Sequence, residues 1–265
     1  MTILEEIVMF KKLEVDRRKK EVKVHDLEDT PLYKRCALSL KKSLQELYKT
    51  GIIAEFKRKS PSKGVINEQA DITEVTSAYT QYGASGLSVL TDEKFFGGSS
   101  ADLMKARENE IPVLRKDFII DDYQLVESRS IGADAILLIA ACLTPIEVEY
   151  LASFAKSLGL EVVLEIHEEA ELNHICDAVD IVGVNNRDLK TFEVDMGLSR
   201  RLAEMIPAGK IKIAESGIQT VDDIILLRKH GFQGFLVGER FMREENPGKS
   251  FGDFVKELAG NKEHG

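Results

Sequence analysis

The stretch GIIAEFKRKSPSKG, residues 51–64, changes abruptly from apolar to charged and ends in a Ser-Pro-Ser-Lys-Gly loop. A short apolar run bounded by turn residues is typical of a buried strand. Because alternate side chains of a strand share a face, we expect Ile53, Glu55 and Lys57 on one side and the intervening residues on the other. A carboxylate and an ammonium group at the end of a buried strand indicate a functional site. The alternative is an ordinary strand with a solvated end.

Similar apolar runs recur at intervals of roughly 20 to 35 residues. With the first, they are GIIAEF (51–56), GLSVLT (86–91), IPVLRKD (111–117), DAILLIA (134–140), EVVLEIH (161–167), DIVGVN (180–185), KIKIAES (210–216) and GFLVGE (234–239). An amphipathic stretch long enough for one helix follows each run, at 71–82, 99–109, 121–130, 144–158, 167–178, 195–206, 220–230 and 250–259. Upstream, two helical series are separated by Thr30-Pro31, the second being Leu38, Leu40, Leu44 and Leu47.

Eight predicted strands that alternate with eight predicted helices favour an α/β fold, a closed (β/α)8 TIM barrel. A doubly wound open sheet is the alternative, but no dinucleotide-binding loop follows the first strand. No linker divides the chain. We therefore predict one domain over residues 1–265, in which residues 1–50 form a helical extension that covers the barrel mouth.

The composition excludes several classes of protein. The net charge of −9 and the lack of a dominant basic patch argue against nucleic-acid binding. No run of 18 apolar residues is present, so we expect no membrane span. Acidic residues in MTILEEIVMF argue against a signal peptide, and three cysteines without CxxC spacing indicate reduced, buried thiols, so we expect a cytoplasmic protein. The histidines lack metal-ligand spacing; we expect His167 and His174 to be structural or exposed and predict no metal site.

Polar residues end many of the predicted strands. In a (β/α)8 barrel, catalytic groups lie at the carboxyl ends of the strands. A single Lys or Glu there usually marks a solvated loop boundary. Six such residues on the faces expected to point inward instead predict one catalytic site, built from Glu55, Lys57, Lys116, Glu165, Asn185 and Glu215.

Small residues follow the seventh and eighth strands, in AESGI and VGE. Barrels hold phosphate groups between these two loops, and glycine lets the backbone approach an oxyanion closely. A serine after the first strand, beside Lys57, lies where it could close the site from the other side. The predicted phosphate-binding residues are Ser60, Ser216, Gly217, Gly238 and Glu239.

Together these segments resemble the indole-3-glycerol phosphate synthase family, a group of barrel enzymes of tryptophan biosynthesis. The similarity covers nearly the whole chain, including the N-terminal extension. It is carried by IIAEFKRKSPSKG (52–64), LSVLTDEKFFGGS (87–99), VLRKDFIIDDYQ (113–124), VVLEIH (162–167), GVNNRDLKTFEVD (183–195), IAESGI (213–218) and FLVGERFM (235–242). This set in this order is highly specific, whereas AESGI alone is not.

The resemblance implies a lyase that converts 1-(2-carboxyphenylamino)-1-deoxyribulose 5-phosphate to indole-3-glycerol phosphate, carbon dioxide and water. It implies a small phosphorylated substrate, no cofactor and no nucleic-acid or membrane partner. We expect a monomer, with a weak homodimer as the alternative.

The resemblance also implies individual roles. Lys116 matches the family's general acid, and Glu165 matches the general base of the dehydration. Lys57 matches a second essential lysine, near the substrate carboxylate and carbonyl, and Glu215 matches a further acidic residue. The chemistry agrees with these side chains, because ring closure needs a proton for the carbonyl oxygen and dehydration needs an acid and a base. Which lysine donates at which step stays open.

Glu55 and Asn185 match residues that position the substrate and its ring nitrogen, and Phe96 and Phe118 match residues of the aromatic-ring pocket. Glu239 stands where some members have a small hydroxyl residue. If its carboxylate faced the phosphate, repulsion would weaken binding; if only its backbone N–H is used, the change matters little.

Two other functions compete with this one. Phosphoribosylanthranilate isomerase is also a phosphate-binding barrel, but it would need a Cys/Asp pair, and the first strand here offers Glu55 and Lys57 without a cysteine. A catalytically silent scaffold on the same fold is a different class of function. Against it, the whole charged constellation is present.

Overall fold

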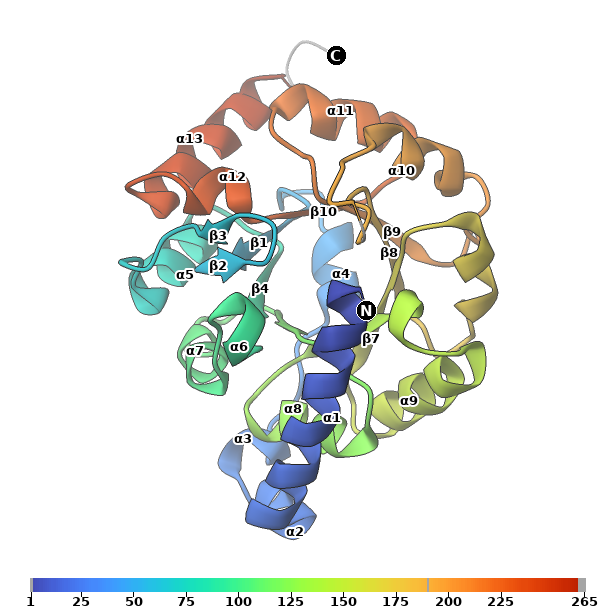
Figure 1. Ribbon diagram of the computed structural model, residues 1–265. Helices are drawn as coiled ribbons and strands as arrows, with labels where there is room; N and C mark the ends of the chain where they lie inside the picture. The colour runs from blue at the N-terminus through green and yellow to red at the C-terminus, as the bar shows by residue number, and fades with distance from the viewer. Residues whose placement is uncertain (1, 190, 262–265) are drawn as a thin grey trace.

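The computed structural model describes residues 2–189 and 191–261, so the predicted domain over residues 1–265 extends beyond the described positions at both ends. Its centre is a closed barrel of parallel strands with helices around it (Figure 1). In the order in which neighbours pair, the barrel strands are β1 (Ile52–Phe56), β10 (Gly234–Val237), β9 (Ile211–Glu215), β8 (Ile181–Asn185), β7 (Glu161–Ile166), β6 (Ala135–Ile139), β5 (Val113–Lys116) and β4 (Gly86–Leu90). The predicted TIM barrel is confirmed, and the open sheet is excluded.

Helices follow the strands as the periodicity predicts, with one difference. The outer α-helices are α5 (Ile72–Gln81), α7 (Ser100–Ala106), α8 (Asp122–Ser130), α9 (Pro145–Ser157), α10 (Met196–Ala203), α11 (Val221–Lys229) and α13 (Pro247–Gly260). The helix expected at 167–178 is instead a 3-10 segment, η2 (Glu169–His174). No side chain caps its start, and the Glu171 carboxylate turns back to accept a hydrogen bond from the His167 backbone N–H at 2.5 Å.

Smaller elements lie in the connecting loops. They are the hairpin strands β2 (Lys59–Ser60) and β3 (Gly64–Val65), the short helices α6 (Glu93–Phe96) and α12 (Glu239–Met242), and the 3-10 turn η1 (Ala140–Cys142). The hairpin, α6 and α12 follow β1, β4 and β10 respectively, so they build the rim at the carboxyl ends of the strands.

Strand alternation divides the core into two clusters. The inward cluster contains Ile53, Leu114, Val163 and Ile213, which fill the barrel interior. The outward cluster contains the residues between them, such as Ile52 and Ala54, packed against the surrounding helices. Each of these four inward residues is followed two positions later by a polar one at the strand end, so the pleat that builds the core also aims those polar groups into the barrel.

The N-terminal extension divides between the two ends of the barrel. It consists of α1 (Ile3–Glu21), α2 (Val24–Glu28), α3 (Pro31–Lys34) and α4 (Leu40–Gln45). Leu40 and Leu44 of α4 belong to the inward cluster and pack at the amino ends of the strands; a Cβ on Gly86, where β4 begins, would lie 2.6 Å from Leu40 Cδ1. In the same predicted series, Leu38 and Leu47 are exposed. Helix α1 lies across the opposite end (Figure 1).

Buried charges attach α1 to the barrel. The Lys11 side chain is only 2% exposed, and its Nζ lies 2.9 Å from Asp92 Oδ2 and 3.0 Å from Asp117 Oδ1. Burial alone would lower the pKa of Lys11, but these carboxylates and Glu14 raise it above its ordinary value. Because Asp92 and Asp117 follow β4 and β5, one ammonium group ties α1 to two loops of the rim.

The three cysteines are free thiols, but none of them is fully buried, contrary to the expectation from their apolar surroundings. Cys36, in the segment between α3 and α4, is exposed, and Cys142 and Cys176 are partly exposed. Within residues 2–189 and 191–261, no helix combines the length and the apolar character needed to cross a bilayer.

Candidate active site

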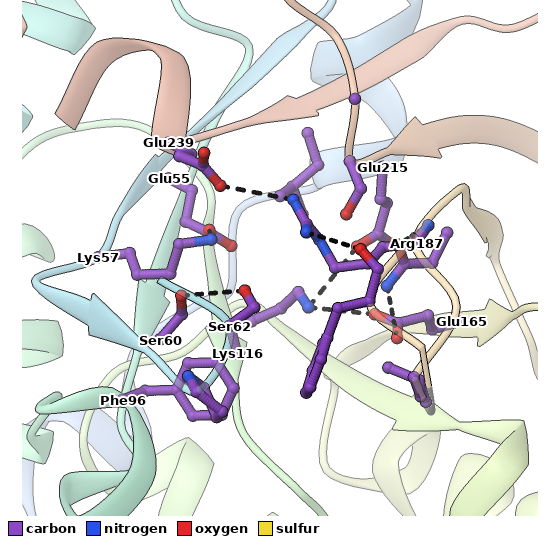
Figure 2. A pocket seen from close by; sticks show the side chains of 18 of the residues that line it. Glu55, Lys57, Ser60, Ser62, Phe96, Lys116, Glu165, Arg187, Glu215 and Glu239 are labelled. Carbon is purple, nitrogen blue, oxygen red and sulfur yellow. Dashed lines mark hydrogen bonds and ion pairs between the residues drawn. The ribbon is translucent and has the colours of Figure 1, made fainter. Parts of the chain in front are cut away.

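A cavity opens at the carboxyl ends of the barrel strands. All six side chains predicted for the catalytic site line it. Figure 2 labels Glu55, Lys57, Lys116, Glu165 and Glu215, which reach into the cavity from different sides. They come from β1, the residues just after it, β5, β7, β8 and β9. The cavity-lining members are Glu55, Lys57, Lys116, Glu165, Asn185 and Glu215.

Lys116 lies among carboxyl groups. Its Nζ donates a hydrogen bond to Glu165 Oε2 at 3.1 Å and lies 3.6 Å from Glu215 Oε2. Burial alone would lower the pKa of Lys116, but the negative charges of Glu165, Glu215 and Glu55 outweigh it and hold that pKa well above its ordinary value. The side chain is therefore an ammonium group aimed into the cavity.

Glu165 is held from several directions. Besides Lys116 at Oε2, its Oε1 accepts a hydrogen bond from Asn185 Nδ2 at 3.1 Å and lies 3.1 Å from His167 Nε2. Burial would raise the pKa of Glu165, but Lys116, His167 and Asn185 outweigh it and place that pKa well below its ordinary value. Glu165 is thus a carboxylate with a fixed orientation.

Glu215 has the opposite character. Burial, opposed by Lys116 but reinforced by the charges of Glu165 and Glu55, raises the pKa of Glu215 to about 8. The neighbouring strand makes room for it, since a Cβ on Gly183 would collide with Glu215 Oε1. Near neutral pH the site therefore holds one protonated carboxyl group beside one ionised carboxylate, on adjacent sides of the same lysine.

The first strand contributes an ion pair of its own. Lys57 Nζ lies 2.7 Å from Glu55 Oε1, and Ser88 Oγ donates to Glu55 Oε2 at 3.4 Å. A Cβ on Gly238 would lie 2.8 Å from both Cβ and Oε1 of Glu55. Gly238 therefore leaves space for the Glu55 side chain, a constraint that the sequence did not reveal.

The five residues predicted to bind phosphate all line the cavity, Ser60 from the loop after β1 and the others from the segments after β9 and β10. Ser216 and Gly217 have φ angles of 65° and 81°, in the left-handed region where a serine is strained. The Glu239 carboxylate is paired: its Oε2 accepts from Arg187 at 3.4 Å, and its Oε1 lies 3.7 Å from Lys63 Nζ. Figure 2 shows the Arg187–Glu239 contact across the cavity.

Another part of the cavity lining is apolar. The rings of Phe96 and Phe118 both line the cavity, with centroids 5.9 Å apart. Ile3 and Leu4 at the start of α1 also line it. One cavity thus combines an aromatic wall, a charged floor and an edge of small residues.

Sequence reasoning missed several lining residues. Arg187, Leu189 and Phe192 belong to the loop after β8, and Phe192 has a left-handed φ of 62°. For Arg187 a signal was available in the sequence. The strand alternation that placed Asn185 in the site also puts Arg187, two positions later, on the same face. Ile3 and Leu4 carried no such signal, since the position of α1 depends on its tertiary contacts.

His167 was expected to be structural or exposed, and it is mostly buried behind Glu165. Burial lowers the pKa of His167, but its contacts with Glu165 and Glu171 outweigh this and raise that pKa to about 9.

Within the described residues, no group of three His, Cys, Asp or Glu side chains has the geometry of a metal site.

Solved structures share this fold at low sequence identity. Tryptophan synthase subunit alpha from Legionella pneumophila superposes with a TM-score of 0.60 at 14% identity, covering 85% of this chain and 98% of that one. 3-Hexulose-6-phosphate synthase from Salmonella typhimurium gives a TM-score of 0.60 at 14% identity, covering 79% and 98%. At these identities the likeness concerns the barrel alone.

Comparison of the sequence is more specific. The family model for indole-3-glycerol phosphate synthase matches residues 4–254. The indole-3-glycerol phosphate synthase of Bacteroides thetaiotaomicron is 46% identical over 257 residues, covering 97% of this chain and 98% of the relative. That of Caldanaerobacter subterraneus subsp. tengcongensis is 44% identical over 262 residues, covering 97% and 99%. These matches confirm the resemblance found in the sequence, and the chain belongs to the indole-3-glycerol phosphate synthase family.

Proposed function

We propose that this protein closes the indole ring of 1-(2-carboxyphenylamino)-1-deoxyribulose 5-phosphate and releases indole-3-glycerol phosphate, carbon dioxide and water. The observation that carries the proposal is the meeting of Lys57, Lys116 and three glutamates in one cavity. That cavity also has an aromatic wall and an edge of small residues after β9 and β10. The charged cluster corresponds to the reacting carbons of this substrate, the aromatic wall to its ring and the edge of small residues to its phosphate.

In the ring closure, an anthranilate carbon attacks the substrate ketone while its oxygen gains a proton. Lys116 supplies that proton in our proposal, because its ammonium group points into the cavity from the end of β5. A raised pKa does not prevent this transfer, since the oxygen of a ketone under attack becomes as basic as an alkoxide. The carboxyl group then leaves as carbon dioxide, and its electron pair restores conjugation to the ring.

The dehydration that follows needs a base for the ring-carbon proton and an acid for the departing hydroxyl. Glu165 is the ionised carboxylate and acts as the base in our proposal. Glu215 carries a proton near neutral pH, so it is suited to assist the leaving hydroxyl or to hand a proton to Lys116, whose Nζ lies 3.6 Å away.

The substrate's phosphate is proposed to lie between Gly217 and Gly238, reached by Ser60 from the first loop. Arg187 and Lys63, which hold the Glu239 carboxylate, neutralise the negative charge that this residue brings to the edge. Phe96 and Phe118 face the anthranilate ring, and Lys57 lies where it attracts the carboxylate before it departs. Glu55 and Asn185 position the substrate and fix Lys57 and Glu165.

Helix α1 is proposed to cover the cavity, because Ile3 and Leu4 line its wall and Lys11 ties the helix to the rim. Exclusion of water at the mouth strengthens the electrostatic interactions inside. One chain supplies every residue used here, which supports a monomer as the active unit. We place the enzyme in the cytoplasm, where its phosphorylated substrate would be available.

The direct test is product formation from the purified protein. The chain contains no tryptophan, so indole fluorescence that grows on addition of substrate reports the product against a low background. We expect stoichiometric release of carbon dioxide with the fluorescence. Conversion of phosphoribosylanthranilate without indole formation would instead identify an isomerase, and tight binding of substrate without turnover would identify a silent scaffold.

A further inference from the structure

We propose that His167 is a positioning residue of the reaction: an imidazolium group that clamps Glu165 from the side opposite Lys116 and is itself held by Glu171. The inference rests on the proposed function, because it assumes that Glu165 is the base. His167 does not line the cavity, so it acts through Glu165 rather than on the substrate.

The geometry places the ring between two carboxylates. Nε2 of His167 lies 3.1 Å from Glu165 Oε1, and Nδ1 lies 3.6 Å from Glu171 Oε2. Neither ring nitrogen makes a hydrogen bond within the described part of the chain, and at 3.6 Å the Nδ1 contact is too long for one, so both contacts are ion pairs by distance. The Glu171 carboxylate is fixed in turn by the His167 backbone N–H, which donates to Oε2 at 2.5 Å.

The low exposure of these side chains indicates the charge state of the His167 ring. The side chains of His167 and Glu171 are each 10% exposed, and that of Glu165 is 3% exposed. Two carboxylates facing one neutral ring in a nearly dry place would repel each other, whereas an imidazolium between them satisfies both. The pair of partners therefore selects the protonated ring, in agreement with a pKa of about 9.

The other groups around the ring do not supply that charge. Lys116 reaches Glu165 from the cavity side, at Oε2, and the amide of Asn185 shares Oε1 with His167. Cys142 of η1 is near both carboxylates, but burial, with the charges of Glu165 and Glu171, raises the pKa of its thiol to about 12, so it stays neutral. Within the described residues, His167 is the cation on the far side of Glu165.

The consequence for catalysis is orientation and ionisation of the base. With Lys116 at one oxygen and His167 and Asn185 at the other, the carboxylate plane is fixed. An opposite charge this close lowers a carboxyl pKa by about 1–3 units. Without His167, Glu165 would therefore take up its proton at a higher pH and turn more freely.

The test compares His167→Gln with His174→Gln. His174 lies on the same 3-10 segment, but its ring contacts the backbone oxygens of Glu171 and Leu143, not Glu165. We expect His167→Gln to lower kcat about 10-fold to 100-fold and to change kcat/KM much less, because Glu165 acts after carbon dioxide has been released. We also expect the acid limb of its kcat profile to move up by about one pH unit or more. The control should keep the wild-type limb.

A measurement on the unmodified enzyme keeps the inference testable if the variant folds poorly. In an NMR titration of the histidine rings, His167 should remain protonated at pH 8, and Glu165→Gln should lower its pKa. Titration of His167 at its ordinary value would overturn the inference. The inference would also be overturned if Glu165→Gln is inactive but the two histidine variants have superimposable pH profiles. Full activity of Glu165→Gln would instead refute the proposed role of Glu165 itself.

Discussion

The two ends of this barrel are built from the same strands but differ in chemistry. At the amino ends, Leu40 and Leu44 of α4 pack onto an apolar interior. At the carboxyl ends, charged side chains line a cavity that α1 borders with Ile3 and Leu4. Both closing helices belong to the same N-terminal extension, so one segment stabilises the fold at one end and completes the site at the other.

Inside the barrel, buried charge is concentrated at the open end. At the closed end, packing alone determines the residue, and any apolar side chain of the right shape would serve. At the open end, the ionised groups near Lys116 are retained although burial disfavours each charge. Function accounts for these charges better than stability does, and variants at each end should separate the two.

The largest expected effect is at the open end. Glu165→Gln keeps the shape of the side chain and removes the base, so kcat should fall by about 10²–10⁴-fold. Because the base acts after ring closure, a ring-closed, decarboxylated intermediate should accumulate in rapid-quench samples. A kcat near that of the wild type would show that the base lies elsewhere.

At the closed end, Leu40→Ala should reverse the pattern. Leu40 is fully buried, and its removal leaves a cavity between α4 and the strands, so the free energy of unfolding should drop by about 2–5 kcal/mol. The folded fraction should retain wild-type kcat and KM. Denaturant titration with activity measurements checks both expectations. A large loss of kcat in fully folded protein would show that packing at the closed end also affects catalysis.

Truncation of residues 1–22 removes α1 and leaves α4 in place, which isolates the part of the extension at the cavity. We expect a folded barrel with KM raised about tenfold or more, because the apolar wall and the cover over the site are lost. Deletion of residues 1–40 would also remove Leu40 and confuse the two effects. Wild-type steady-state kinetics in the shorter truncation would reduce α1 to a structural appendage.

The smallest effect concerns the proton on Glu215. Its folded pKa of about 8 exceeds the ordinary value of 4.5, so between these two values the native state binds more protons than the unfolded state. Its contribution to stability is therefore present below the lower value and is lost as the pH rises toward 8. Glu215→Gln should flatten this decline in thermal melts taken from pH 6 to pH 9. An unchanged slope would show that Glu215 is ionised in the native protein.

The barrel and most of the proposed catalytic residues that line its cavity were predictable from the sequence. The period of the apolar runs predicts the barrel, and the rule that sites lie at the carboxyl ends of strands predicts the lining by Glu55, Lys116 and Glu165. The same periodicity did not predict that Leu40 points into the barrel while Leu47 is 95% exposed, because an apolar series does not identify the surface against which it packs. The protonation of Glu215 was equally hidden, since it depends on distances among side chains from several strands.

A comparison of the two lysines tests whether Lys116 is the acid of ring closure. Single-turnover experiments should compare Lys116→Met with Lys57→Met under saturating enzyme, following consumption of substrate and release of carbon dioxide. We predict that Lys116→Met slows ring closure by about 10²–10⁴-fold while substrate affinity changes much less. A near-normal rate for Lys116→Met, together with abolished ring closure in Lys57→Met, would contradict the account and exchange the two roles.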